Sequence, residues 1–173
     1  MLIGKNPLNE APEWFVKNIA ERPEECSVNV NGANVKYFIW GDKSKKPLLL
    51  LHGYNAHSFW WDHIAPSLTE NHCVVGLDFS GMGESDRREV YSQEIFVDDV
   101  KGVIDDLSWK SCTCIAHSMG GSIATLATSI YPDIFEHLIL LDSMIVIPPN
   151  VAERMSSNLS LIHISEPTRP LYI

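Results

Sequence analysis

Basic residues are scarce in this chain of 173 residues. Thirteen lysines and arginines stand against 22 aspartates and glutamates, and the formal net charge is −9. Proteins that bind nucleic acids or anionic membranes neutralise phosphates with clustered lysine and arginine side chains. Because the acidic excess is spread along the chain without such a cluster, we expect neither nucleic acid nor membrane as a partner.

Long hydrophobic runs are also lacking. The longest, such as the LLLL of residues 48–51, are far shorter than the ~20 apolar residues that a spanning helix needs. The N-terminal stretch MLIGKNPLNEAPEWF lacks the continuous apolar core of a secretory signal peptide. These two absences predict a cytoplasmic protein.

Cysteine is sparse as well, and the four residues are Cys26, Cys73, Cys112 and Cys114. The C-x-C pair at 112 and 114 has no second cysteine pair to complete a zinc site. We interpret all four as free thiols that are mostly buried. The sequence therefore implies no metal and no organic cofactor.

The pattern of apolar residues predicts an α/β domain. Alternating apolar residues flank Asn31-Gly32, which is typical of an antiparallel hairpin. Four short apolar runs then alternate with segments of helical periodicity. We expect strands at 48–51, 73–77, 112–116 and 138–141, and helices at 58–68, 95–107 and 123–130. The prediction is one mostly parallel sheet with helices on both faces after an N-terminal hairpin.

Polar and glycine-rich segments follow each predicted parallel strand, where ligands bind in such sheets. In AHSMG, Ser118 lies at a strand-to-helix turn with the small residues Ala116 and Gly120 two positions away. This placement presents a nucleophilic hydroxyl and aims the Met119 amide at an oxyanion. We expect the second oxyanion donor to be the amide of Tyr54, with Asn55 as the alternative.

Three of these loops together resemble the α/β-hydrolase family. They are LLLLHG, the D-x-x-G-x-G-x-S formed by Asp78, Gly81, Gly83 and Ser85, and AHSMGG. The resemblance covers about residues 28–149, and it departs from the family's G-x-S-x-G where alanine stands at 116. It implies a triad in the chain order serine, acid, histidine.

The resemblance also narrows the chemistry. Relatives similar to haloalkane dehalogenases or epoxide hydrolases carry an aspartate where this chain has Ser118. Serine favours esters, thioesters, lactones, amides or activated C–C bonds of a small acyl-type substrate, cleaved through an acyl-enzyme. A ligand-binding protein without catalysis and an acyltransferase with the same triad are the alternatives.

Several residues have a second interpretation. Ser118 could be a helix N-cap, and Asp142 could be either the triad acid or a loop-forming aspartate. Asp78 is interpreted as a turn stabiliser, and His52 as a structural hydrogen-bonding residue. Trp60 and Trp61 are expected in the core.

No histidine before the tail is expected to be the catalytic base. His57 and His63 are interpreted as surface residues and His117 as a packing residue with a satisfied ring nitrogen. His137 precedes a strand, so it belongs at the amino end of the sheet. Only His163 then remains.

The tail that contains His163 has another interpretation. LSLIHISEPTR is similar, residue for residue, to the translation of a transposon-end adapter used in sequencing libraries. We therefore expect residues 1–158 to be the N-terminal part of one hydrolase domain and residues 159–173 to be adapter-derived. The triad histidine would then be absent, the strand at 138–141 would be an unpaired edge, and the fragment would have little activity.

Overall fold

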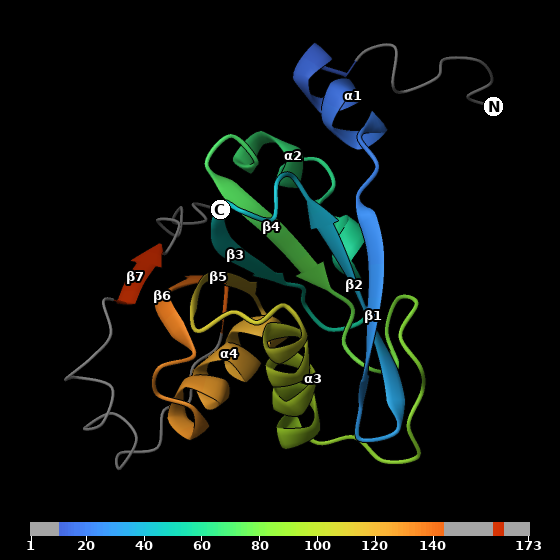
Figure 1. Ribbon diagram of the computed structural model, residues 1–173, viewed down its shortest axis with the longest axis vertical. Coiled ribbons are helices and arrows are strands. Elements are labelled where there is room, and N and C mark those ends of the chain that lie inside the picture. Colours follow the sequence, from blue (N-terminus) through green and yellow to red (C-terminus); the bar gives the residue numbers. More distant parts are fainter. Residues whose placement is uncertain (1–10, 144–160, 165–173) are drawn as a thin grey trace, which may run out of the picture.

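A sheet of seven strands forms the centre of the computed structural model, which describes residues 11–143 and 161–164 (Figure 1). The strand order is β1-β2-β4-β3-β5-β6-β7. The strands are β1 (Glu24–Val30), β2 (Ala33–Trp40), β3 (Lys46–Leu51), β4 (His72–Leu77), β5 (Cys112–His117), β6 (Phe135–Leu141) and β7 (Leu161–Ile164). All strand pairs from β4 to β7 are parallel, whereas β1 and β2 add an antiparallel hairpin at one edge.

The hairpin turn follows directly from its two residues. Asn31 and Gly32 have φ angles of 49° and 87°. Two successive positive φ angles match the right-handed twist of a tight hairpin, and asparagine and glycine adopt them at low cost. The predicted hairpin is confirmed.

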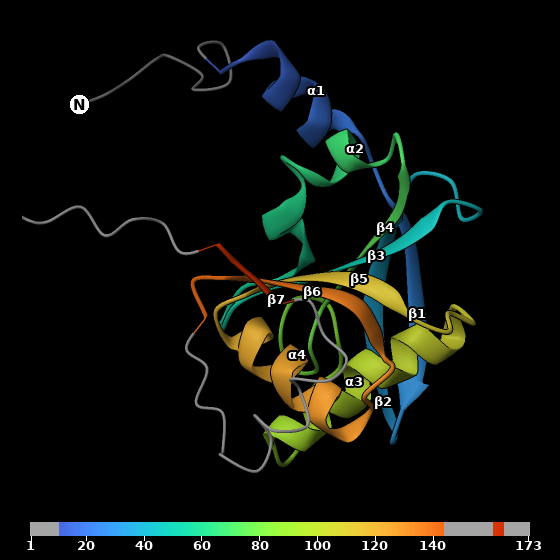
Figure 2. The same cartoon turned by 90° about the vertical axis from the view of Figure 1, so that its left-hand side faces the viewer.

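Helices cover both faces of the sheet. They are α1 (Glu13–Ala20), the 3₁₀ helix η2 (Ser58–Trp61), α2 (Ala65–Leu68), α3 (Gln93–Asp106) and α4 (Met119–Ile130). Figure 2 shows α3 and α4 together on one side of the sheet and α1 and α2 on the other. The larger apolar core lies between the sheet and the pair α3 and α4, and the smaller core lies on the side of η2 and α2. The predicted fold class is therefore confirmed.

The predicted helix over residues 58–68 is divided in two. Pro66 has no N–H to donate to the carbonyl four residues earlier, so the first turn cannot continue as one α-helix. The chain instead closes tighter turns, for example through the Ile64 amide, which donates to the Trp61 carbonyl at 2.9 Å. After this division, Trp61 is buried and Trp60 is exposed.

Helix α1 was not predicted from the sequence. This helix packs on α2 through Asn18, whose side chain is buried and donates to the His63 carbonyl at 2.8 Å and to Ser67 Oγ at 2.6 Å. The helix has only eight residues, and its periodicity is too short to distinguish it from a polar connecting segment.

The strand β6 is not an unpaired edge. β7 lies parallel to it, with Leu140 opposite His163, so that expectation is wrong for the residues that the structure describes. Ladder hydrogen bonds join backbone groups, and β6 can therefore pair with an extended segment of any origin. The origin of residues 159–173 stays a prediction.

The interpretation of the cysteines is confirmed. All four are free, and Cys73, Cys112 and Cys114 are buried. Burial raises the pKa of the Cys112 thiol to about 12. The thiol stays protonated near neutral pH and is chemically inert.

Candidate active site

Ser118 occupies a strained turn between β5 and α4. Its φ and ψ angles are 51° and −117°, a region that non-glycine residues rarely adopt. The Ser118 amide donates to the Leu141 carbonyl of β6 at 3.0 Å, and the Ser118 carbonyl accepts from the Gly121 amide at 3.0 Å. The flanking elements thus hold the backbone in this conformation.

The Ser118 side chain does not cap the helix. It stands at the N-cap position of α4 but makes no capping hydrogen bond. The interpretation of Ser118 as a simple helix cap is therefore wrong. The hydroxyl, which is half-buried, stays available for chemistry at the carboxyl end of the parallel strands.

The small residues beside Ser118 are required by close backbone contacts. Ala116 is fully buried. A Cβ atom placed on Gly120 would lie 2.6 Å from the His52 carbonyl oxygen and 2.9 Å from the Leu51 carbonyl oxygen. Helix α4 therefore begins in contact with the end of β3, which brings the two loops together.

Replacing Gly120 with alanine is expected to lower the free energy of unfolding by about 2–3 kcal/mol, because backbone atoms of β3 must move to admit the methyl group. Gly32→Ala is the matched control. Its Cβ meets no atom within 4 Å, so only the positive φ angle contributes, at about 1 kcal/mol. Urea unfolding measures both variants, and equal losses would contradict the close approach at Gly120.

The loop after β3 borders Ser118 directly. A Cβ atom on Gly53 would lie 3.3 Å from Ser118 Cβ and 2.9 Å from His117 Nδ1. The Ala56 amide donates to the Gly53 carbonyl at 3.3 Å, which closes a turn around Tyr54. The Tyr54 side chain is 74% exposed, so only its backbone is positioned by this turn.

His52 is a structural hydrogen-bonding residue, as predicted. Its side chain is fully buried, its Nδ1 lies 2.7 Å from the Gly53 carbonyl oxygen, and its Nε2 accepts from the Phe79 amide at 3.2 Å. Burial lowers the pKa of the His52 imidazole. The ring therefore links the loops after β3 and β4.

Asp78 stabilises the loop after β4, which confirms its predicted role. The fully buried carboxylate accepts from the Ser58 amide at 2.6 Å and from the Glu84 amide at 2.8 Å. A Cβ atom on Gly83 would lie only 1.9 Å from Asp78 Oδ2. The glycine therefore lets the loop fold tightly around the carboxylate.

Trp60 lies beside the candidate nucleophile and not in the core. Trp61 is buried as predicted, but Trp60 is 53% exposed and stacks on His117, with ring centroids 5.8 Å apart and planes 13° apart. The core prediction for Trp60 is wrong because η2 is a 3₁₀ helix, in which residue positions rotate differently from those of an α-helix. Stacking confirms His117 as a packing residue, although its ring nitrogens make no hydrogen bond to the described residues.

Asp142 directly follows β6, whose Leu141 carbonyl accepts from the Ser118 amide. The residue is exposed and has a φ angle of 47°. Aspartate tolerates this left-handed conformation, so a turn accounts for the residue as well as a triad role does. Its two interpretations both stay predictions.

Two of the other histidines lie where their interpretations put them: His57 is exposed, and His137 is exposed near the amino end of β6. His63 is only half-buried at the surface, because Phe15 of α1 packs against its ring. The position of the His163 side chain lies outside what the structure describes.

One buried ion pair was not predicted from the sequence. Asp99 of α3 is fully buried, accepts from the Ser80 amide at 2.9 Å and pairs with Arg88 at 2.9 Å. Arg88 also donates to the Val30 carbonyl at 2.8 Å, which ties the loop after β4 to the hairpin. The sequence did hold a signal: Asp99 is three residues after Phe96 and four before Val103, on the buried face of the helix.

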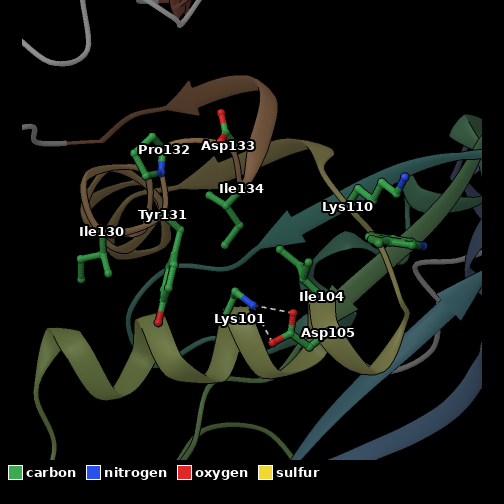
Figure 3. Close-up of a pocket in the computed structure, with 10 residues that line it drawn as sticks. Lys101, Ile104, Asp105, Lys110, Ile130, Tyr131, Pro132, Asp133 and Ile134 are labelled. Carbon is green, nitrogen blue, oxygen red and sulfur yellow. Dashed lines mark hydrogen bonds and ion pairs between the residues drawn. The ribbon is translucent and has the colours of Figure 1, made fainter.

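A groove of about 320 Å³ lies away from Ser118 (Figure 3). Trp109 and Lys110, which line it, precede β5, and residues 131–134 precede β6. The groove therefore opens at the amino ends of the strands. Lys101 at its wall bonds Asp105 and lies over the Tyr131 ring at 5.4 Å.

The described part of the chain contains neither a candidate metal site nor a membrane-spanning helix. Across 11–143 and 161–164, no group of three or more histidine, cysteine, aspartate or glutamate residues could hold a metal ion. Within the same part of the chain, no helix is long and apolar enough to cross a bilayer.

Comparison with known proteins supports the assignment of the fold. A serine hydrolase-like protein of Danio rerio is 33% identical over 122 residues, which are 69% of this chain and 37% of that relative. Epoxide hydrolase 4 of Mus musculus is 33% identical over 122 residues, covering 68% of this chain and 34% of the relative. The chain thus spans about a third of the length of these relatives.

A solved structure of a membrane phospholipase A superposes with a TM-score of 0.68 at 30% identity, over 73% of this chain and 42% of that chain. The family model described as alpha/beta hydrolase fold matches residues 46–171, a range that includes β3, the Asp78 loop and the Ser118 turn. The chain therefore belongs to the α/β-hydrolase fold family.

Proposed function

We propose that this chain is part of a serine hydrolase in which Ser118 is the nucleophile. The observation that carries the proposal is the strained Ser118 backbone, with a φ angle of 51° and a side chain that makes no capping bond. Strain of about 1–3 kcal/mol persists only where the surroundings enforce it, and such residues cluster at active sites. Here the strained residue lies between β5 and α4, and its amide donates to the Leu141 carbonyl of β6.

The proposed reaction forms and cleaves an acyl-enzyme. Ser118 Oγ attacks the acyl carbon of the substrate while its proton passes to a histidine base, and the tetrahedral oxyanion accepts from the Met119 and Tyr54 amides. Met119 opens α4, so no carbonyl within the helix occupies its amide. Collapse of the tetrahedral intermediate expels the leaving group, which takes the proton from the histidine. Water then hydrolyses the acyl-enzyme and releases the carboxylic acid.

Serine at position 118 supports an acyl-type substrate such as an ester, thioester, lactone or amide. Epoxide hydrolase 4 is among the similar proteins. Epoxide opening would require a carboxylate nucleophile at the position where this chain has Ser118. The names of a serine hydrolase-like protein and a phospholipase are consistent with acyl chemistry. The substrate of the whole protein is part of this proposal.

We also propose that residues 1–158 are the N-terminal part of a longer hydrolase and that residues 159–173 derive from adapter sequence. The chain spans 37% and 34% of two relatives, which supports the first part. The likeness of LSLIHISEPTR to a translated adapter supports the second. Reading the nucleotide sequence across codon 158 tests it, and a genomic copy that continues through LSLIHISEPTR would refute it.

Labelling with a fluorophosphonate tests the nucleophile in the full-length protein, meaning the longer hydrolase proposed above. Activated serines of hydrolases form a phosphonyl ester, and peptide mass spectrometry locates it. An adduct on Ser118 is the expected result. A correctly folded full-length protein that gives no adduct at Ser118 would overturn the proposal and favour a binding protein of the same fold.

A further inference from the structure

His52 connects the loop after β3, which borders Ser118, to the loop after β4. It follows β3 directly, its side chain is 0% exposed, and its ring packs edge-on against Phe79 with centroids 5.0 Å apart. The ring is too deep to touch a substrate. Any effect that it has on chemistry must therefore pass through the groups that it bonds.

The two bonds of the imidazole define its tautomer. A backbone amide can only donate, so the Phe79 N–H requires an unprotonated Nε2 at the other end of the 3.2 Å contact. A carbonyl can only accept, so the Gly53 oxygen at 2.7 Å requires a proton on Nδ1. The ring thus donates to Gly53 and is held in that orientation by Phe79.

The Gly53 carbonyl and the Tyr54 amide belong to the same peptide group. No cis peptide bond occurs among the described residues, so this C=O and this N–H point in opposite directions. Because the carbonyl points at the buried imidazole, the Tyr54 N–H points away from it. Fixing the oxygen therefore fixes the direction of the amide.

This peptide group lies beside the nucleophile. A Cβ atom on Gly53 would lie 3.3 Å from Ser118 Cβ. Two donors oppose rotation of this peptide plane, since the Gly53 carbonyl oxygen also accepts from the Ala56 amide at 3.3 Å. Oxyanion donors act by being preorganised, so a donor that cannot rotate is worth more than one that can.

We propose that His52 is a positioning residue whose donation to the Gly53 carbonyl turns the Tyr54 amide toward the oxyanion at Ser118. The inference rests on the proposed function, because the amide has this role only if Ser118 is a nucleophile. It goes beyond that function by assigning the orientation of one oxyanion donor to a side chain that never meets the substrate.

Two substitutions separate the two bonds of the ring. In His52→Asn the side-chain amide nitrogen reaches the position of Nδ1 and keeps the donation to Gly53. In His52→Gln the side-chain oxygen reaches the position of Nε2 and keeps only the bond from Phe79. In the full-length protein, His52→Gln should slow the transfer of the phosphonyl group from the fluorophosphonate to Ser118 by about 10- to 100-fold. Binding of the reagent should not change. His52→Asn should stay within about threefold of the unmodified protein.

The outcomes distinguish this inference from the proposed function. If the unmodified full-length protein is not labelled at Ser118, the proposed function fails. If it is labelled and His52→Gln is labelled equally fast, or if His52→Asn loses as much as His52→Gln, the positioning role is wrong while the nucleophile stands.

A measurement on the unmodified protein covers the case in which either variant does not fold. Long-range ¹H–¹⁵N correlation spectra report which ring nitrogen of a histidine carries the proton. We expect the Nδ1–H form for His52. The Nε2–H form would remove the donor to Gly53 and overturn the inference.

Discussion

Ester hydrolysis by the full-length protein is expected to fall about 10⁴- to 10⁶-fold when Ser118 is replaced by alanine, and fluorophosphonate labelling should disappear. The substitution removes the atom that forms the acyl-enzyme while it leaves the Met119 and Tyr54 amides in place. Oxyanion donors alone retain only a small residual rate over water. Hydrolysis of 4-nitrophenyl acetate measures the effect.

Ser129→Ala is the matched control for this experiment. Ser129 is also half-buried and lies on α4, about three turns beyond the strained residue that precedes this helix. Its replacement should leave hydrolysis within about twofold, since surface substitutions away from special features change little. If Ser118→Ala retained most of the hydrolysis, the nucleophile would have to be another group.

A further variant tests whether the Ser118 backbone is strained. Ser118→Gly should raise the free energy of unfolding by about 1 kcal/mol relative to Ser118→Ala, because glycine adopts positive φ without steric cost. Urea unfolding of the two inactive proteins measures the difference. Equal stabilities would mean that the turn stores no strain.

Replacing Arg88 with methionine is expected to lower the free energy of unfolding by about 3–5 kcal/mol near pH 7, because it leaves the buried Asp99 carboxylate without its cation. Arg88 is 11% exposed and Asp99 is 0% exposed, so water cannot take over the role of the guanidinium. The Val30 carbonyl loses a donor as well. Urea unfolding at pH 7 measures the loss.

The loss should depend on pH in a defined direction. Burial raises the pKa of the Asp99 carboxyl, and hydrogen bonds from Ser80 and Arg88 oppose that rise. A carboxyl whose folded pKa exceeds its unfolded value contributes stability below the unfolded pKa, and that contribution is lost as pH rises through the folded pKa. Removing Arg88 takes away one opposing cause, so the folded pKa rises further and the destabilisation should be smaller at pH 5 than at pH 7.

Arg87→Met is the control for charge and size, since Arg87 is the exposed neighbour of Arg88. It should change the free energy of unfolding by no more than about 0.5 kcal/mol. The double variant Arg88→Met with Asp99→Leu should recover part of the loss, because an apolar pair leaves no buried charge. A loss in Arg88→Met that is the same at pH 5 and pH 7 would contradict the role of the Asp99 charge.

Much of the fold could be predicted from short stretches of sequence. Asn31-Gly32 specified the hairpin turn, and four apolar runs located the strands β3, β4, β5 and β6 of the parallel part but not β7. These signals are local, because turn residues act through their own φ angles and buried strands through their own hydrophobicity. The turn at Ser118 was predicted for the same reason, because its neighbours Ala116 and Gly120 mark a tight turn at a strand end.

Other features depend on residues that are distant in sequence. Trp60 is beside Ser118 and not in the core because Pro66 interrupts the helix, and the partner on which it stacks, His117, comes from β5. Arg88 pairs with Asp99 through the packing of α3 against a loop. The pairing of β7 with β6 depends on which backbone groups remain unoccupied after the sheet has formed.

The sequence by itself determined the family of folds, the position of the candidate nucleophile and the class of chemistry that a serine supports, since each follows from residue types at short spacing. Only the tertiary structure decided that the Ser118 side chain is not a helix cap and that the His52 ring lies between the Gly53 carbonyl and the Phe79 amide. It also decided that the Asp99 charge is buried against Arg88. The physical reason is that hydrogen-bond direction and burial are properties of groups brought together by packing, and no stretch of sequence contains both partners.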